Sequence, residues 1–131
     1  MKKLFISCPM RNRTEENIKL SMQRMHKIAE IVFDQELEVI SSYVEECPPE
    51  NVNPGVWYLG KSIQKLAEAD FFIGVDYYSD FFKGCCFERD IARQYGICST
   101  LVDMRGLMPD ALDVEGHYWQ TTCKVSEIST S

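Results

Sequence analysis

The chain has 131 residues, a length that fits one hydrophobic core, and we expect residues 1–131 to form a single domain. Hydrophobic residues make up 45% of the sequence and charged residues 26%, a balance that excludes disordered, collagen-like and coiled-coil proteins. The formal net charge of −6 argues against binding to a nucleic-acid polymer, which requires a basic surface. A few local basic groups would still suffice to hold the phosphate of a small ligand.

The sequence predicts a cytoplasmic protein without a membrane segment. Lys2 and Lys3 lead into only a few apolar residues before Cys8, which is too short for the core of a signal peptide. The longest apolar run, residues 69–75, contains Asp70 and is far too short to span a bilayer. The six cysteines are then expected to be free thiols. Because they contain no CxxC pair, we expect no metal site. We also expect no cofactor.

In chain order, the first half of the sequence predicts a strand, a helix, a strand and a helix. Residues 3–7 predict a short buried strand, and Thr14 caps the helix that follows it. A second strand is predicted at 37–41. Asn53 then caps a second helix, with Pro54 in its first position.

The second half continues the alternation of strands and helices. Residues 71–76 predict the clearest core strand, because they are apolar and end in an acid. A third helix follows Gly84, and Gly96 ends it as a C-terminal cap. Residues 99–102 predict a fourth strand, and 117–125 predict a last strand or an extended segment.

This alternation predicts an α/β fold with a mostly parallel sheet that is covered on both faces. In such sheets ligands bind beyond the carboxyl ends of the strands. Residues 7–13, residues 76–83 and the start of the third helix should therefore converge on one cleft.

Glu88 is the strongest candidate for chemistry. We expect it in the first turn of the third helix, where free backbone N–H groups and the helix dipole stabilise an anion. Its neighbours Cys86, Phe87 and Ile91 are apolar. An acid at a helix start is common without any function, but a carboxylate held near apolar walls also suits nucleophilic attack on a sugar carbon.

Three basic residues and an aromatic segment lie in the converging loops. Arg11 and Arg13 are either solvated loop charges or, with Lys83, a clamp for a phosphate group. The aromatic segment contains Tyr77, Tyr78, Phe81 and Phe82. These rings would either stack on a purine or pyrimidine base or form a dimer interface.

Three motifs in this order resemble the nucleoside 2-deoxyribosyltransferase superfamily. They are FISCPM at 5–10, ADFFIG at 69–74, and GCCFE at 84–88 with Ala92 and Gly96 after it. The chain is most similar to the small phage and bacterial members, and the related 2′-deoxynucleoside 5′-phosphate N-hydrolases share the layout. The resemblance covers roughly residues 3–102.

The resemblance implies a flavodoxin-like or Rossmann-like three-layer sandwich with about five strands. Glu88 would attack C1′ of a deoxyribosyl group, and water or a second base would resolve the covalent glycosyl-enzyme. A second acid would assist the leaving base, and Asp76 and Asp80 are the nearby candidates. A homodimer is also implied, because relatives build the site from two subunits.

The chain departs from the family at several supporting positions. Phe5 stands where the family commonly has a tyrosine, and Ser62 where it has the aspartate usually assigned to protonation of the base. Phe82 replaces an acid or serine that holds the 5′ end of the sugar, and Cys8 replaces a glycine. These departures favour the alternative that the pocket binds a ligand without turnover.

Two functional hypotheses follow, and a third, self-association through the aromatic loop as the primary role, has less support. The first is an enzyme that cleaves or transfers at the N-glycosidic bond of a nucleoside or its 5′-monophosphate. The second is a non-catalytic protein that binds and sequesters a nucleotide or nucleotide signal. Besides Glu88, the expected ligand-binding residues are Ser7, Cys8, Pro9, Met10, Arg11, Arg13, Ser62, Tyr77, Phe82, Lys83 and Gly84.

Overall fold

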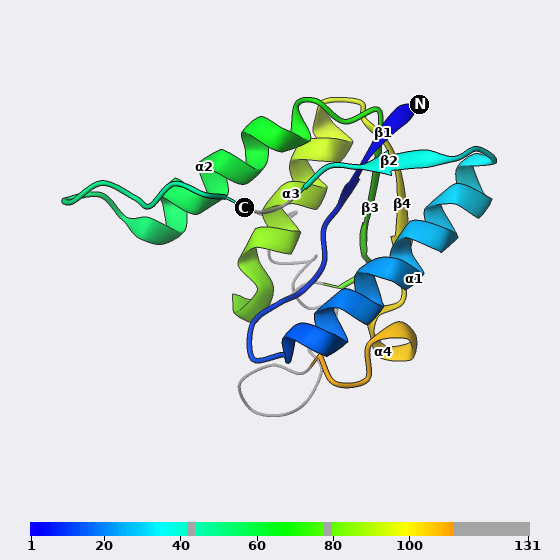
Figure 1. Ribbon diagram of the computed structural model, residues 1–131, viewed down its shortest axis with the longest axis horizontal. Helices are drawn as coiled ribbons and strands as arrows, with labels where there is room; N and C mark the ends of the chain where they lie inside the picture. The colour runs from blue at the N-terminus through cyan, green and yellow to red at the C-terminus, as the bar shows by residue number, and fades with distance from the viewer. Residues whose placement is uncertain (42–43, 78–79, 112–131) are drawn as a thin grey trace, which may run out of the picture.

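The computed structural model describes residues 1–41, 44–77 and 80–111, except the side chain of Asp80 (Figure 1). The strands are β1 (Lys2–Ile6), β2 (Leu37–Val39), β3 (Phe71–Val75) and β4 (Cys98–Val102). The helices are α1 (Glu15–Phe33), α2 (Pro54–Leu66), α3 (Lys83–Gln94) and the short α4 (Met104–Leu107), with a 3-10 turn, η1, at Asp80–Phe82.

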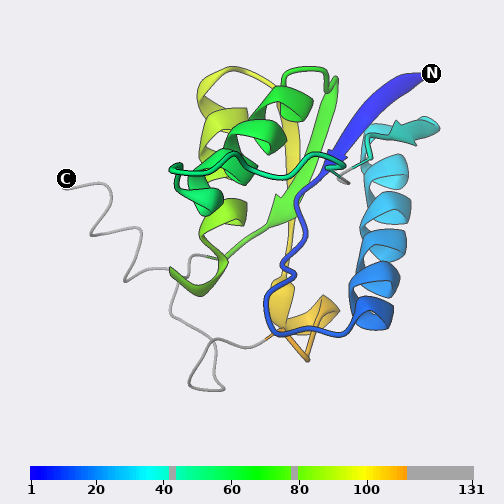
Figure 2. The ribbon, with the colours of Figure 1, turned by 60° about the vertical axis from the view of Figure 1, so that its left-hand side comes forward.

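The strands form one parallel sheet in the order β2-β1-β3-β4. Helix α1 covers one face of the sheet, and α2 and α3 cover the other (Figures 1 and 2). This arrangement confirms the predicted flavodoxin-like or Rossmann-like α/β sandwich. The expectation of about five strands was wrong for the described residues, which form four; the segment 117–125 lies outside them.

Successive side chains of a strand point to opposite faces of the sheet, so the hydrophobic core is divided into two clusters, one on each face. Leu4 and Ile6 of β1 pack in the larger cluster with Met25 of α1, whereas Phe5 packs in the smaller one with Phe72. The rings of Phe5 and Phe72 stack with centroids 5.9 Å apart. By the same alternation, Ser7, which follows Ile6, directs its side chain toward the face covered by α2 and α3.

The predicted caps account for where the helices begin and end. The Thr14 hydroxyl accepts a hydrogen bond from the Asn17 amide, and the Asn53 side-chain oxygen accepts one from the Val56 amide, each at 3.1 Å. Gly96 follows α3 with φ of +73°, a left-handed conformation that favours glycine. Helix α4, which the apolar pattern did not predict, begins after Asp103, whose side chain accepts from the Arg105 amide.

None of the helices in the described ranges combines the length and the apolar character that a membrane crossing requires.

Gly74 tests the packing of the sheet against α2 and α3. A Cβ atom built there would lie 2.7 Å from the ring of Phe72, which is fully buried and cannot move away. We expect Gly74→Ala to lower the free energy of unfolding by about 1–3 kcal/mol, as overpacking does. Urea denaturation measures the change.

Gly60→Ala is the matched control, because nothing lies within 4 Å of its added Cβ on α2. Alanine favours the helix there, and we expect a gain of about 0.5–1 kcal/mol. Equal effects at the two glycines would contradict the tight packing described for Gly74.

Candidate functional site

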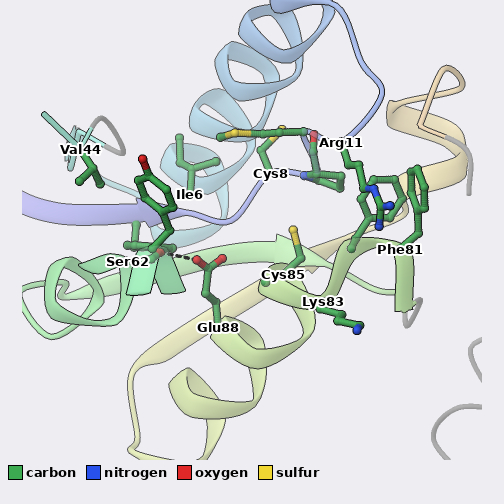
Figure 3. A pocket seen from close by; sticks show the side chains of 15 residues that line it. Ile6, Cys8, Arg11, Val44, Ser62, Phe81, Lys83, Cys85 and Glu88 are labelled. Atoms are coloured by element: carbon green, nitrogen blue, oxygen red, sulfur yellow. Dashed lines mark hydrogen bonds between the residues drawn. The ribbon is translucent and has the colours of Figure 1, made fainter. Parts of the chain in front are cut away.

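A pocket of about 330 Å³ opens at the carboxyl edge of the sheet. Its walls come from the loop after β1, from η1 and the start of α3, and from α2 (Figure 3). The volume is near the lower end of the range of small-molecule sites, roughly 300–1,000 Å³. The three predicted segments thus contribute to one cleft, and α2 adds a fourth wall.

Glu88 points into this pocket and is held by two serine hydroxyls. Ser7, directly after β1, donates from its Oγ to Oε1 of Glu88 at 2.6 Å. Ser62 of α2 donates from its Oγ to the other carboxylate oxygen, Oε2 (Figure 3). Each carboxylate oxygen therefore has its own hydroxyl donor, and the plane of the group is fixed relative to the pocket.

Burial raises the pKa of Glu88, although the hydrogen bonds from Ser62 and Ser7 act to lower it. Desolvation disfavours the charged form of a carboxyl group, whereas hydroxyl donors favour it. Two neutral donors thus orient this group without fully compensating its charge. Perturbed carboxyl groups in clefts are characteristic of functional sites.

The expectation that Glu88 lies in the first turn of its helix was wrong. Helix α3 begins at Lys83, so Glu88 lies in the second turn. Its cap residue, Phe82, supplies no side-chain hydrogen bond. Free amides act only within the first turn. Serine hydroxyls, which are remote in sequence, take the role that we had expected of the helix start.

Two thiols line the pocket near the carboxylate. Burial raises the pKa of Cys8 to about 11, against the opposing influence of Arg13. Burial and the neighbouring Glu88 also raise the pKa of Cys85. Both groups are therefore thiols at neutral pH and act as apolar walls (Figure 3).

None of the five described cysteines is part of a disulfide, and Cys123 lies outside the described ranges. Within those ranges, no three His, Cys, Asp or Glu side chains are grouped so as to hold a metal ion.

The mouth of the pocket carries positive charge. The Arg11 guanidinium lies 4.2 Å from the centroid of the Phe81 ring, a cation–π contact that keeps the charge at the opening (Figure 3). Lys83 is exposed and also lines the pocket. The pocket thus combines one partly buried carboxylate, Glu88, with two exposed cations, Arg11 and Lys83.

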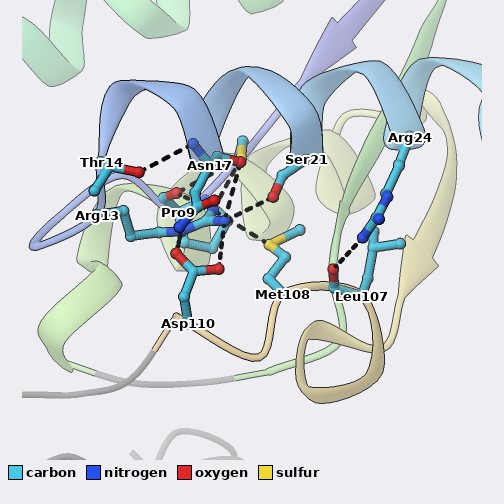
Figure 4. Close-up of polar contacts among 10 residues, drawn as sticks. Pro9, Arg13, Thr14, Asn17, Ser21, Arg24, Leu107, Met108 and Asp110 are labelled. Atoms are coloured by element: carbon cyan, nitrogen blue, oxygen red, sulfur yellow. Dashed lines mark hydrogen bonds and ion pairs between the residues drawn. The ribbon is translucent and has the colours of Figure 1, made fainter.

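Arg13 does not line the pocket, although it follows the same strand as Arg11. Its side chain is only 1% exposed and forms a two-point ion pair with Asp110, with N···O distances of 2.8 and 3.0 Å (Figure 4). These contacts occupy the guanidinium on the side away from the cleft. Arg13 is therefore not placed to contact a ligand there.

The other predicted residues fall into two groups. Pro9, Met10, Phe82 and Gly84 line the pocket together with Cys8, Arg11, Ser62 and Lys83. Ser7 is buried and does not line the pocket, but it donates to Glu88. Tyr77 does not, because it is buried in the core under α1. Asp76 is exposed at the end of β3 and does not line the pocket, while Tyr78 and the Asp80 side chain lie outside the described part of the chain.

Tyr58 is a lining residue that the motif analysis did not single out. It lies four residues before Ser62 on α2, and residues at that spacing share one face of a helix. Helical spacing from Ser62 was thus the available signal for its place in the pocket.

The chain matches no known protein-family model and no curated protein. Function is therefore inferred from the geometry of this pocket and from the resemblance of the motifs around it.

The raised pKa of Glu88 predicts a specific pH dependence of stability. The folded protein binds a proton at Glu88 more tightly than the unfolded chain does. This contribution to the free energy of unfolding is fully present below about pH 4.5, the ordinary pKa of glutamate, and is lost as the pH rises through the higher pKa of the folded state. We expect wild-type protein to lose stability relative to Glu88→Gln over that window. Urea denaturation at several pH values measures the difference between their slopes.

Glu46→Gln serves as the control, because Glu46 should change stability with pH in the opposite direction to Glu88. The hydrogen bond and charge of Lys61 lower the pKa of Glu46. Its contribution is present above about pH 4.5 and is lost as the pH falls through the lowered pKa. A Glu88→Gln protein with the same pH slope as wild type would contradict the desolvation of Glu88.

Proposed function

We propose that this pocket binds a (deoxy)nucleoside or its 5′-monophosphate, and that Glu88 acts as a nucleophile at the N-glycosidic bond. A Glu88 oxygen forms a bond to C1′ while the bond from C1′ to the base nitrogen breaks. The base leaves with that electron pair and takes up a proton. Water or a second base then attacks C1′ and releases the carboxylate, giving hydrolysis or transfer respectively.

The single observation that carries this proposal is the two-serine support of Glu88. A nucleophile must be held in a reactive orientation before the substrate arrives. Ser7 and Ser62 orient both carboxylate oxygens while the pocket side of the group faces the cleft. Because neutral hydroxyls leave the charge incompletely compensated, a positive charge that develops on the sugar would be stabilised there.

The charge distribution supports a 5′-phosphorylated ligand. Arg11 and Lys83 are exposed, whereas Glu88 is partly buried, and all three line the same pocket. A nucleotide with its sugar at Glu88 would direct its phosphate toward the two cations. The rings of Phe82 and Tyr58, which also line the cleft, offer flat surfaces for a base.

The second candidate is a protein that binds a nucleotide without turnover. Among the described residues, Glu88 is the one carboxylate that lines the pocket, and Asp76 lies outside it. Phe5 lines the pocket without offering a hydroxyl group. These two observations favour a pocket that has kept its ligand and lost the acid that assists the leaving base.

We further propose that the protein is a cytoplasmic homodimer, as the motif resemblance implies. Val56 of α2 and Phe87 of α3 are exposed by 67% and 49%, and a second subunit would remove such apolar surface from water. Size-exclusion chromatography with light scattering gives the oligomeric state.

The direct test is Glu88→Gln assayed against deoxynucleosides and their 5′-monophosphates. Glutamine keeps the shape and one acceptor oxygen but is a very poor nucleophile, so we expect base release to disappear while ligand binding survives. Chromatography measures free base, and thermal shift measures binding. Glu38→Gln, an exposed acid on β2, is the matched control and should behave as wild type.

Base release that persists in Glu88→Gln would contradict the assignment of Glu88 as nucleophile. Binding without base release in wild type would instead select the non-catalytic alternative. In that case Glu88→Gln should change affinity by about 1.5–3 kcal/mol through a lost charge-assisted hydrogen bond.

Arg11→Ala separates phosphate recognition from recognition of the nucleoside. We expect this substitution to weaken the binding of 5′-monophosphates by about 1.5–3 kcal/mol and to leave the binding of unphosphorylated nucleosides nearly unchanged. Isothermal titration calorimetry measures both affinities. Lys19→Ala removes an exposed cation from α1 and should affect neither ligand. If Arg11→Ala weakened the binding of 5′-monophosphates and of nucleosides equally, the proposed phosphate clamp would be contradicted.

A further inference from the structure

Arg13 joins three parts of the chain behind the pocket. Besides its ion pair with Asp110, its Nη1 donates to the Pro9 carbonyl oxygen at 2.9 Å. Its Nη2 donates to the Ser21 hydroxyl at 2.7 Å and to the Asn17 carbonyl oxygen at 3.3 Å (Figure 4). One buried guanidinium thus connects the loop after β1, helix α1 and the segment after α4.

The loop that Arg13 holds is a wall of the pocket. Cys8 and Pro9 both line the cleft, and Nη1 of Arg13 also lies 3.6 Å from the Cys8 sulfur. The Arg13 amide donates to the Met10 carbonyl oxygen at 3.2 Å, so backbone and side chain secure the same turn. Asn12 within this turn has φ of +59°, a conformation that needs such support.

We propose that Arg13 is a positioning residue of the pocket, which holds the wall formed by Cys8 and Pro9, and that Asp110 holds Arg13 in turn. The effect on the wall follows from the contacts alone. An effect on turnover rests on the proposed function. Residue 110 thereby influences the site from outside the cleft.

The chemistry of the pair explains why Asp110 matters. A guanidinium offers a planar fork of donors that matches both oxygens of a carboxylate. Without that carboxylate the buried cation would lose its counter-charge, which is a strongly unfavourable state. The Asp110 side chain is 34% exposed, so water can reach this end of the pair. The least costly response is for Arg13 to turn toward solvent and release the Pro9 carbonyl.

Cys8 provides a direct readout of the wall. Its side chain is buried, and its pKa is raised to about 11, so a thiol reagent reacts with it only after local opening. Cys85 lines the same pocket from α3, and the Arg13 hydrogen bonds described above go to other residues, so Cys85 serves as the internal reference. Peptide mass spectrometry after timed iodoacetamide treatment gives the rate at each cysteine.

The test variant is Asp110→Asn in the full chain. We expect the alkylation rate of Cys8 to rise by roughly tenfold, the ratio that corresponds to about 1.4 kcal/mol, while the rate at Cys85 stays unchanged. Arg24→Gln is the matched control. It removes a different bond from α1, the one from Arg24 to the carbonyl oxygen of Leu107 at the end of α4, and this bond does not involve the loop after β1 (Figure 4). Its Cys8 rate should equal that of wild type.

Arg13→Lys provides an independent variant, because lysine keeps the charge but cannot span the same acceptors. We expect it to expose Cys8 selectively as well. Unchanged protection of Cys8 in Asp110→Asn would overturn the inference, and so would an equal rise at Cys8 and Cys85, which would indicate general destabilisation. Base release by wild type is scored separately, so failure of the proposed function and failure of this inference give different results.

Discussion

The parallel pairing of β1 with β3 determines where the site lies. Their last paired residues, Ile6 and Ile73, are level with each other, and the Ser7 amide extends the pairing by donating to the Ile73 carbonyl oxygen at 2.9 Å. The chain then leaves β1 toward α1 on one face and leaves β3 toward α3 on the other. A crevice opens where two such connections diverge. The same bond keeps Ser7 in strand alternation with Phe5, so that its hydroxyl faces α3 and reaches Glu88.

The energetics of Glu88 follow from this placement. A desolvated carboxylate is unfavourable unless its charge is compensated. Here two hydroxyl groups contribute hydrogen bonds, yet the pKa stays above its ordinary value. The carboxylate of Glu88 is thus well oriented, but its negative charge is not fully compensated. A ligand that brings positive charge to the carboxylate, permanently or in a transition state, would supply the missing compensation.

Local signals in the sequence determined most of the fold. Thr14, Asn53 and Gly96 mark helix ends through interactions with their immediate neighbours, and each behaves as local capping rules require. The start of α3 was less predictable, because Phe82 offers no capping side chain. Local rules therefore placed Glu88 one turn too early. For the described residues the expected number of strands was too high, because the last strand had been assigned to 117–125, which lies outside them.

The site depended on information that local patterns do not contain. Arg11 and Arg13 look equivalent in the sequence, but the positive φ of Asn12 turns the chain between them. Arg11 therefore remains at the mouth over Phe81, whereas Arg13 is directed inward to Asp110. Asp110 lies far along the chain, so no spacing rule connects the two. The Ser62 contact is similar, since the role of that hydroxyl depends on how α2 packs beside α3.

The choice of side chain at position 88 bears on whether the pocket does chemistry. A pocket that only encloses a neutral nucleoside would be more stable with an amide or an apolar side chain there, because neither carries the desolvation penalty of a carboxylate. Hydrogen bonding alone does not explain the acid, since one serine hydroxyl could donate to an amide oxygen while the other accepts from the amide NH2 group. A purely anionic ligand does not explain it either, because it would be repelled. A carboxylate at position 88 would instead interact favourably with positive charge on the ligand. In the proposed reaction, a sugar carbon would acquire such charge as its bond to a base breaks, while Arg11 and Lys83 would hold the phosphate of the same molecule.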